Sequence, residues 1–178
     1  MSDRTPYWET HIRPMFRPLD REHMLTFVDE ARRFDLFDYD AVRSRADKIL
    51  RALKRAPPRC MPFPEAGGPW PPEWIALFER WKTLDCPRLE RGNASGWTAT
   101  RNGDTVTLSG RVTKQIADET WIDREGCSEN PREYVLLLER GETSDEETVD
   151  RDVSFPATAG VDIVVIHDAA GRNEVRIT

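Results

Sequence analysis

Residues 97–108 read Trp97-Thr98-Ala99-Thr100-Arg101-Asn102-Gly103-Asp104-Thr105-Val106-Thr107-Leu108. Side chains that suit a pleated, half-buried surface alternate on both sides of Asn102-Gly103, which is the pattern of a β-strand. An Asn-Gly pair between two such runs is the strongest short-range signal of a hairpin. The stretch therefore predicts two antiparallel strands joined at Asn102-Gly103.

The chain after this hairpin continues as short apolar or alternating runs. Further strands are expected at 119–123, 133–140, 153–155, 161–166 and 174–177, the last two forming a second hairpin. Six or seven short strands at this spacing favour an antiparallel β-sandwich, immunoglobulin-like in a generic sense. The acidic stretch 139–152 lacks the glycine and ligand spacing of a calcium loop, so we interpret it as a solvated connection.

The chain before residue 87 has helical periodicity instead. Apolar residues recur at helical spacing in four segments, 8–16, 20–27, 40–54 and 72–84. Residues 57–72 are rich in proline, which predicts a stiff, irregular loop, and Pro72 suits the first turn of the last helix. This half is therefore expected to be helical.

Together these patterns predict an α+β chain in two segregated parts. We expect an all-α module over residues 1–88, a linker over 89–96 and an antiparallel β-sandwich over 97–178.

Charge and cysteine content narrow the function classes. The net charge is −6, and residues 91–178 hold 17 acidic against 10 basic side chains, so this half should repel nucleic acid and anionic membranes. No apolar run is long enough to span a membrane. The cysteines, Cys60, Cys86 and Cys127, form no Cys-x-x-Cys pair, and with no apolar leader they suggest a reducing, cytoplasmic location.

Two segments of the helical half carry a family resemblance. The first is Trp8-Glu9-Thr10-His11-Ile12-Arg13-Pro14-Met15-Phe16, and the second runs from Cys60-Met61-Pro62 through Gly67-Gly68 to Trp81. Residues 7–86 resemble the class I c-type cytochrome fold, in which a Met-Pro pair supplies the distal haem ligand and a last helix packs on the first. The resemblance implies that Met61 stands at the ligand position and that 72–84 is the final helix.

The chain differs from c-type cytochromes in its haem-attachment segment. Covalent haem attachment needs a Cys-x-x-Cys-His run, and the corresponding stretch, Arg17–His23, holds no cysteine. The resemblance is therefore to a haem-less relative of that fold, of an uncharacterised bacterial kind. No family is assigned to the β part.

Two sets of residues are candidates for a cofactor or metal. His23 and Met61 would suit the two axial positions of a non-covalent haem, but Met61 equally suits filling the space of a lost haem. His11 and Cys60 are candidates for a metal such as copper, although no ligand spacing supports them. No cofactor is expected, and haem or copper remain the alternatives.

A recognition surface is expected in the proline-rich loop. Trp70 is the candidate anchor for a protein partner, with Pro69 and Pro71 holding the backbone rigid. The competing interpretation is that this loop only covers the haem cavity. His167-Asp168 suggests a catalytic triad, but no G-x-S-x-G elbow accompanies it, so no catalytic residue is named.

These observations favour a non-catalytic accessory or interaction protein, a partner subunit or chaperone-like companion of a larger bacterial enzyme. The alternatives are a redox or metal-binding protein using His23, Met61 or Cys60, and a carrier that holds a small ligand in the vacated haem cavity.

Overall fold

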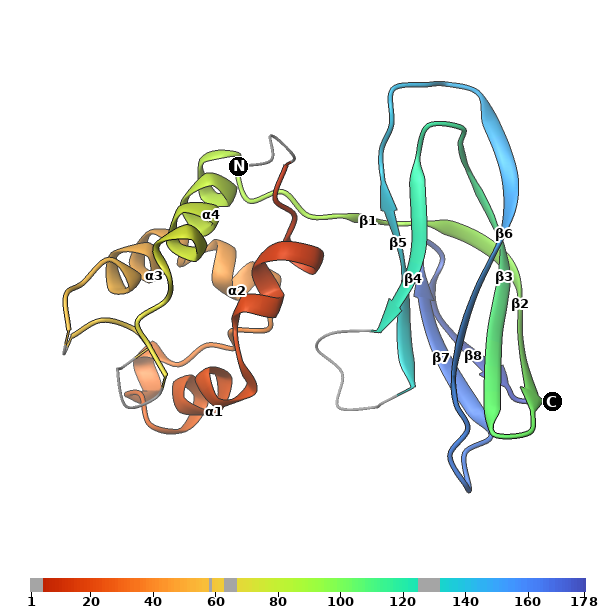
Figure 1. Ribbon diagram of the computed structural model, residues 1–178, viewed down its shortest axis with the longest axis horizontal. Helices are drawn as coiled ribbons and strands as arrows, with labels where there is room; N and C mark the ends of the chain where they lie inside the picture. The colour runs from red at the N-terminus through yellow and green to blue at the C-terminus, as the bar shows by residue number, and fades with distance from the viewer. Residues whose placement is uncertain (1–4, 58, 63–66, 125–131) are drawn as a thin grey trace. The chain divides into compact units, whose positions relative to one another are not determined.

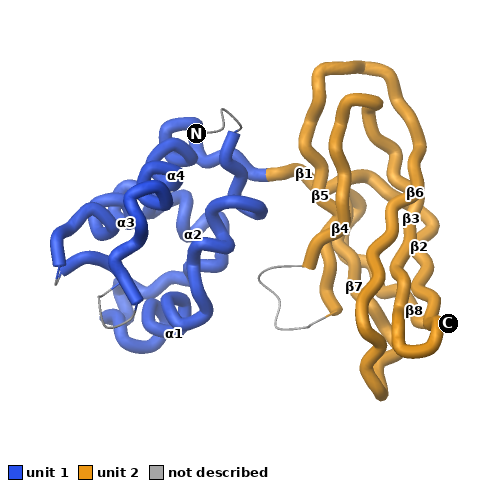
Figure 2. Tube along the Cα trace, in the orientation of Figure 1, with its two compact units in different colours: residues 1–88 blue, residues 89–178 orange. Residues whose placement is uncertain are grey.

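The computed structural model describes residues 5–57, 59–62, 67–124 and 132–178. The chain divides into two compact units, residues Met1–Arg88 and Leu89–Thr178, shown in separate colours in Figure 2. The first holds helices and the second holds strands (Figure 1). None of the helices among these residues is long and apolar enough to cross a membrane.

The first unit is built from short helical elements. They are the π-helical turn η1 (Trp8–Ile12), the 3₁₀ turns η2 (Arg13–Met15) and η3 (Glu30–Arg32), and the α-helices α1 (Pro18–Thr26), α2 (Tyr39–Arg43), α3 (Ala46–Leu53) and α4 (Pro72–Thr83). Their ends follow local chemistry. The Asp38 carboxylate accepts the Ala41 N–H at the start of α2, and proline occupies the first turn of α1 and of α4. The single helix expected over 40–54 is broken near Ser44 into α2 and α3.

Aromatic side chains form the core of this unit. Phe78 and Trp81 of α4 are fully buried. Trp8 packs on Trp81 with ring centroids 5.8 Å apart, and Phe16 packs on Phe78 with centroids 6.3 Å apart. The Trp81 indole N–H donates to the Pro87 carbonyl at 2.8 Å, and the backbone N–H of Trp8 donates to the same oxygen at 3.0 Å. These bonds fasten the end of the unit to its first turn.

The second unit consists of two sheets. The strands are β1 (Glu90–Arg91), β2 (Asn93–Asn102), β3 (Thr105–Gln115), β4 (Glu119–Arg124), β5 (Glu133–Glu139), β6 (Glu146–Pro156), β7 (Ile163–Asp168) and β8 (Gly171–Arg176). One sheet has the order β1-β5-β7-β8, with β4 also paired to β5, and the other has the order β2-β3-β6. A core of apolar side chains lies between them, made chiefly by Val106, Leu108, Tyr134, Val164 and Ile166.

The predicted hairpin around Asn102-Gly103 is confirmed, but its turn lies one residue later. Asn102 and Thr105 are paired strand residues, and Gly103-Asp104 is the two-residue loop. Gly103 has φ +60 and Asp104 has no positive φ, which is the geometry of a type II′ turn. The predicted hairpin at the end of the chain is confirmed as β7 and β8.

The predicted fold class is wrong in both halves. β5 and β7 pair in parallel within a mixed sheet, so unit 2 is not an antiparallel, immunoglobulin-like sandwich. The continuous buried run of β5, Tyr134–Leu138, is typical of an interior strand, and such a run does not reveal the direction of its neighbours. The helices are short and interrupted by π and 3₁₀ turns, and they do not form the distinct all-α module that the cytochrome resemblance implies.

Two further expectations differ from the structure. Residues 89–96, expected as a linker, contribute to β1 and β2. The acidic stretch 139–152, expected as a solvated connection, is partly a strand, because β6 begins at Glu146.

Candidate functional site

The predicted axial ligands lie in different elements of unit 1. His23 lies on α1, where its ring stacks on Phe27 with centroids 5.4 Å apart. Phe27 is 72% exposed, and α1 contains no buried residue. Met61 is half-buried after α3, and its N–H donates to the Ala52 carbonyl at 3.2 Å. Haem or copper binding by His23 and Met61 stays a prediction.

The predicted metal ligands have partners within the protein. His11 Nδ1 accepts the Tyr7 N–H at 3.1 Å and lies 2.8 Å from the Thr10 hydroxyl. Cys60 is fully buried, with its Sγ 3.5 Å from the Pro62 carbonyl. The residues that the structure describes contain no group of three or more His, Cys, Asp or Glu placed to hold a metal ion.

The predicted partner-binding residues are only partly on the surface. Pro69 and Pro71 are exposed, but Trp70 is 5% exposed and packs on Phe16, with ring centroids 5.3 Å apart. The expected surface anchor is therefore a core residue. The exposed indole of this region belongs to Trp74, which is 40% exposed.

A bulge in β2 creates the most distinctive local structure of unit 2. The register between β2 and β3 shifts between Ser95 and Thr98, and Gly96 within the bulge has φ +65. The Trp97 ring lies directly over Gly110 of β3, where an added Cβ would come within 2.4 Å of a ring carbon. Gly110 therefore makes room for Trp97.

The Trp97 indole joins the bulge to the β7–β8 turn. Its N–H donates to Asp168 Oδ2 at 2.8 Å, while Oδ1 accepts the N–H groups of Ala170 at 2.9 Å and Gly171 at 3.2 Å. Asp168 is 2% exposed, so its side-chain oxygens are buried, and three N–H groups satisfy them. His167 pairs with Glu133 instead, at 2.5 Å. His167 and Asp168 thus bind different partners and do not pair with each other as the His and Asp of a catalytic triad would.

Strands β2 and β8 begin a parallel ladder that is not continued. The Thr178 N–H donates to the Ala99 carbonyl at 2.9 Å, and the Arg101 N–H donates to the Thr178 carbonyl at 2.7 Å. In a parallel ladder the step two residues earlier would join Arg176 to Trp97 and Ala99. The bridge between Ala99 and Ile177 supplies the bond from the Ala99 N–H to the Arg176 carbonyl, and the ladder ends before Trp97, where the register of β2 shifts.

A pocket of about 500 Å³ lies at this interruption. We call it the β2–β8 groove. It is lined by Ala94–Ala99 of β2, by Asp168 and Ala170, and by Asn173–Arg176 and Thr178. The Ile177 N–H donates to the Asp162 carbonyl, and hydrogen-bonded residues alternate along an antiparallel pair. The backbone N–H and C=O groups of Glu174 and Arg176 therefore point away from β7, toward the groove.

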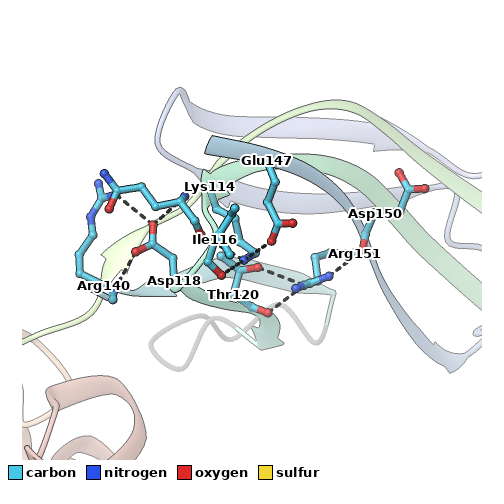
Figure 3. A network of polar contacts seen from close by, with 10 residues as sticks. Lys114, Ile116, Asp118, Thr120, Arg140, Glu147, Asp150 and Arg151 are labelled. Atoms are coloured by element: carbon cyan, nitrogen blue, oxygen red, sulfur yellow. Dashed lines mark hydrogen bonds and ion pairs between the residues drawn. The ribbon is translucent and has the colours of Figure 1, made fainter. Parts of the chain in front are cut away.

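A second polar cluster closes the far end of the sheets (Figure 3). The Lys114 ammonium is buried and donates to Glu147 at 2.6 Å and to the carbonyls of Gln115 and Ile116. Arg151 Nε lies 3.0 Å from both the carbonyl and the hydroxyl of Thr120, which links β6 to β4. Every donor of Lys114 has an acceptor, so Lys114 helps to hold the sheets together.

Asp118 belongs to the same cluster. Its buried carboxylate accepts the Gly141 N–H at 2.8 Å, the Gln115 N–H at 3.1 Å and Arg140 at 3.2 Å. Burial by itself raises the pKa of Asp118, but these donors outweigh it and hold the pKa below its ordinary value.

Comparison with known proteins gives no relative from which to assign the site: no family model matches the chain, and no curated protein or solved structure is significantly similar to it.

Sequence reasoning did not find the β2–β8 groove. The available signal was Ser95-Gly96, which interrupts the alternation just before Trp97. The approach of β8 to β2 could not be inferred, because it joins residues almost 80 positions apart.

Proposed function

We propose that this chain is a non-catalytic interaction protein, a partner subunit whose second unit accepts an extended segment of another protein in the β2–β8 groove. The proposal is carried by one observation, the end of the β2–β8 ladder beside a pocket. The backbone groups of Glu174 point away from β7 toward this space.

A peptide backbone is the ligand that best complements such an edge. It repeats one donor and one acceptor per residue at strand spacing, so it would pair with the outward groups of β8 that precede Arg176, where the pairing with β2 ends. Addition of a strand to an exposed sheet edge is a recurring mode of peptide recognition, in which the main chain supplies affinity. The pocket volume also falls within the range of about 300–1,000 Å³ that is typical of binding sites.

The test removes one outward N–H from the edge. Glu174→Pro deletes the N–H that faces the groove and leaves the β7 ladder bonds in place, whereas Glu174→Ala keeps that N–H. Both variants and the wild type, as full-length tagged chains, are expressed in the native host and purified under mild conditions. Co-purifying proteins are quantified by mass spectrometry.

We expect a stoichiometric partner with the wild type and with Glu174→Ala, and its loss with Glu174→Pro. Hydrogen exchange of the reconstituted complex should then show slower exchange of the Glu174 and Arg176 amides. A partner retained equally by all three chains, or the lack of any specific partner, contradicts the proposal. Circular dichroism and urea unfolding establish that Glu174→Pro is folded.

A further inference from the structure

We propose that unit 1 binds an acidic segment of a partner protein on the outer side of α3, through Lys48, Arg51 and Arg55. This surface belongs to a different unit from the β2–β8 groove. The inference therefore goes beyond the proposed function and adds a second contact of a different chemistry.

Positive charge is concentrated in α3 and the turn that follows it. Residues 46–59 hold five basic side chains and one acidic side chain, whereas the rest of residues 1–88 hold 11 basic and 13 acidic ones. The helix dipole places about half a negative charge at the C-terminal end of α3, which offsets only a small part of this excess.

The helix keeps these cations away from its buried side. Lys48 and Arg51 are exposed one turn apart on α3, and the exposed Arg55 follows one turn later, just past the end of the helix. The other side of α3 contributes apolar residues to the core of unit 1, namely Ala46, Leu50 and Leu53. Helical spacing therefore places Lys48 and Arg51 on the outer side of α3, with Arg55 at its end.

The carboxylates beside α3 are already engaged. Asp47 pairs with Lys82 of α4, and Glu79 of α4 pairs with Lys54. None of the three cations of the proposed surface forms an ion pair with a residue that the structure describes. An incoming carboxylate therefore displaces no existing ion pair.

An acidic protein segment suits this surface better than a nucleic acid does. The chain has a net charge of −6, and because residues 46–59 carry +4, the remainder carries −10. A long polyanion would meet that negative charge beyond α3 and would gain few phosphate contacts, so its binding would be weak. A short acidic segment meets only the local cations, and each guanidinium can donate two parallel hydrogen bonds to one carboxylate.

The spacing of the cations sets the sequence of the segment. Side chains one helical turn apart have Cβ atoms about 5–6 Å from each other. Asp or Glu at positions i and i+4 of a helix, or at i and i+2 of an extended segment, matches that separation. The surface thus calls for two acidic residues at one of these spacings.

The probe is a random dodecapeptide library displayed on phage and selected on four full-length chains. They are the wild type, Arg51→Glu/Arg55→Glu, Glu174→Pro, and Arg32→Glu/Arg91→Glu as the charge-matched control. Arg32 and Arg91 are exposed outside α3 and form no ion pair with a described residue. Circular dichroism and urea unfolding establish that each variant is folded. A fluorescent DNA oligonucleotide, single-stranded or duplex, is titrated in parallel.

We expect the wild type, the charge-matched control and Glu174→Pro to enrich peptides with the paired acidic residues. Arg51→Glu/Arg55→Glu should lose this enrichment and bind the selected peptides about tenfold more weakly at low salt. Binding to the wild type should weaken as salt is added, because the contact lies on the surface.

Each of the other outcomes contradicts the inference. Enrichment without paired acidic residues, or equal binding by Arg51→Glu/Arg55→Glu and the wild type, overturns it. Tighter binding of DNA than of the selected peptides, lost in the same double variant, would assign the surface to a nucleic acid. Loss of binding in Glu174→Pro alone would place the acidic peptides in the β2–β8 groove. Failure of the co-purification test of the groove leaves this surface unaffected, so the two proposals fail separately.

Discussion

At the scale of single residues, Trp97 has the most consequential contact of unit 2. Its indole N–H donates to the buried Asp168 carboxylate, and this bond joins the β2 bulge to the β7–β8 turn. Trp97→Phe keeps most of the ring but leaves Asp168 Oδ2 without that donor. We expect the free energy of unfolding in urea to fall by about 1–3 kcal/mol.

Trp121→Phe on β4 is the matched control, because its indole N–H has no hydrogen-bond partner among the described residues. A double-mutant cycle with Asp168→Asn isolates the pair. An equal fall in the free energy of unfolding for Trp97→Phe and Trp121→Phe would show that the effect comes from the smaller ring and not from the lost hydrogen bond.

Asp118 gives unit 2 a defined response to acid. Because its pKa is lowered in the folded protein, it stabilises the fold above the unfolded-state pKa of about 3.9, and this contribution disappears as pH falls through the folded-state pKa. Asp118→Asn should therefore be less stable than wild type at pH 7, and the gap should narrow steadily below pH 4. Urea unfolding at a series of pH values measures this, with Asp123→Asn, which changes an exposed carboxylate of β4, as the control substitution.

At the scale of elements, the β2–β3 hairpin has a turn that depends on one glycine. Gly103 has φ +60 at the first position of a type II′ turn, a conformation that costs an L-residue about 1–3 kcal/mol, while its Cβ position meets no neighbouring atom. Gly103→Ala should lower the free energy of unfolding by that amount without any steric clash. Asp104→Ala at the second turn position should change it by under ~0.5 kcal/mol, and a similar loss in both variants would exclude the backbone explanation.

Local chemistry explains which elements were predictable. The β2–β3 hairpin and α4 follow from a two-residue turn signal and from Pro72 with helical periodicity, and both are present. The parallel pairing of β5 with β7 was missed because a buried apolar run looks alike in either direction. The β2–β8 groove was missed because it combines a bulge with a contact between distant residues, and neither leaves a periodic pattern.

At the scale of the whole molecule, each unit has a hydrophobic core of its own. Residues 8–86 contribute the aromatic cluster around Trp81, and residues 97–177 contribute the cluster around Leu108 and Ile166. Cys60 and Cys86 are both buried in the first unit, and burial raises the pKa of the Cys86 thiol. Thiol labelling therefore reports on opening of the first unit, because a buried thiol of raised pKa reacts slowly until it is exposed.

Because each unit has a hydrophobic core of its own, we expect the two units to unfold independently. In a Cys127→Ser chain, Trp97→Phe should destabilise unit 2 while leaving the labelling rates of Cys60 and Cys86 unchanged. Leu50→Ala, which truncates a core residue of unit 1, should accelerate labelling at least thirtyfold, because such a truncation costs about 2–5 kcal/mol. Labelling accelerated to a similar degree by both substitutions would mean that the two cores unfold as one cooperative structure, and the groove of unit 2 would then depend on unit 1 for its stability.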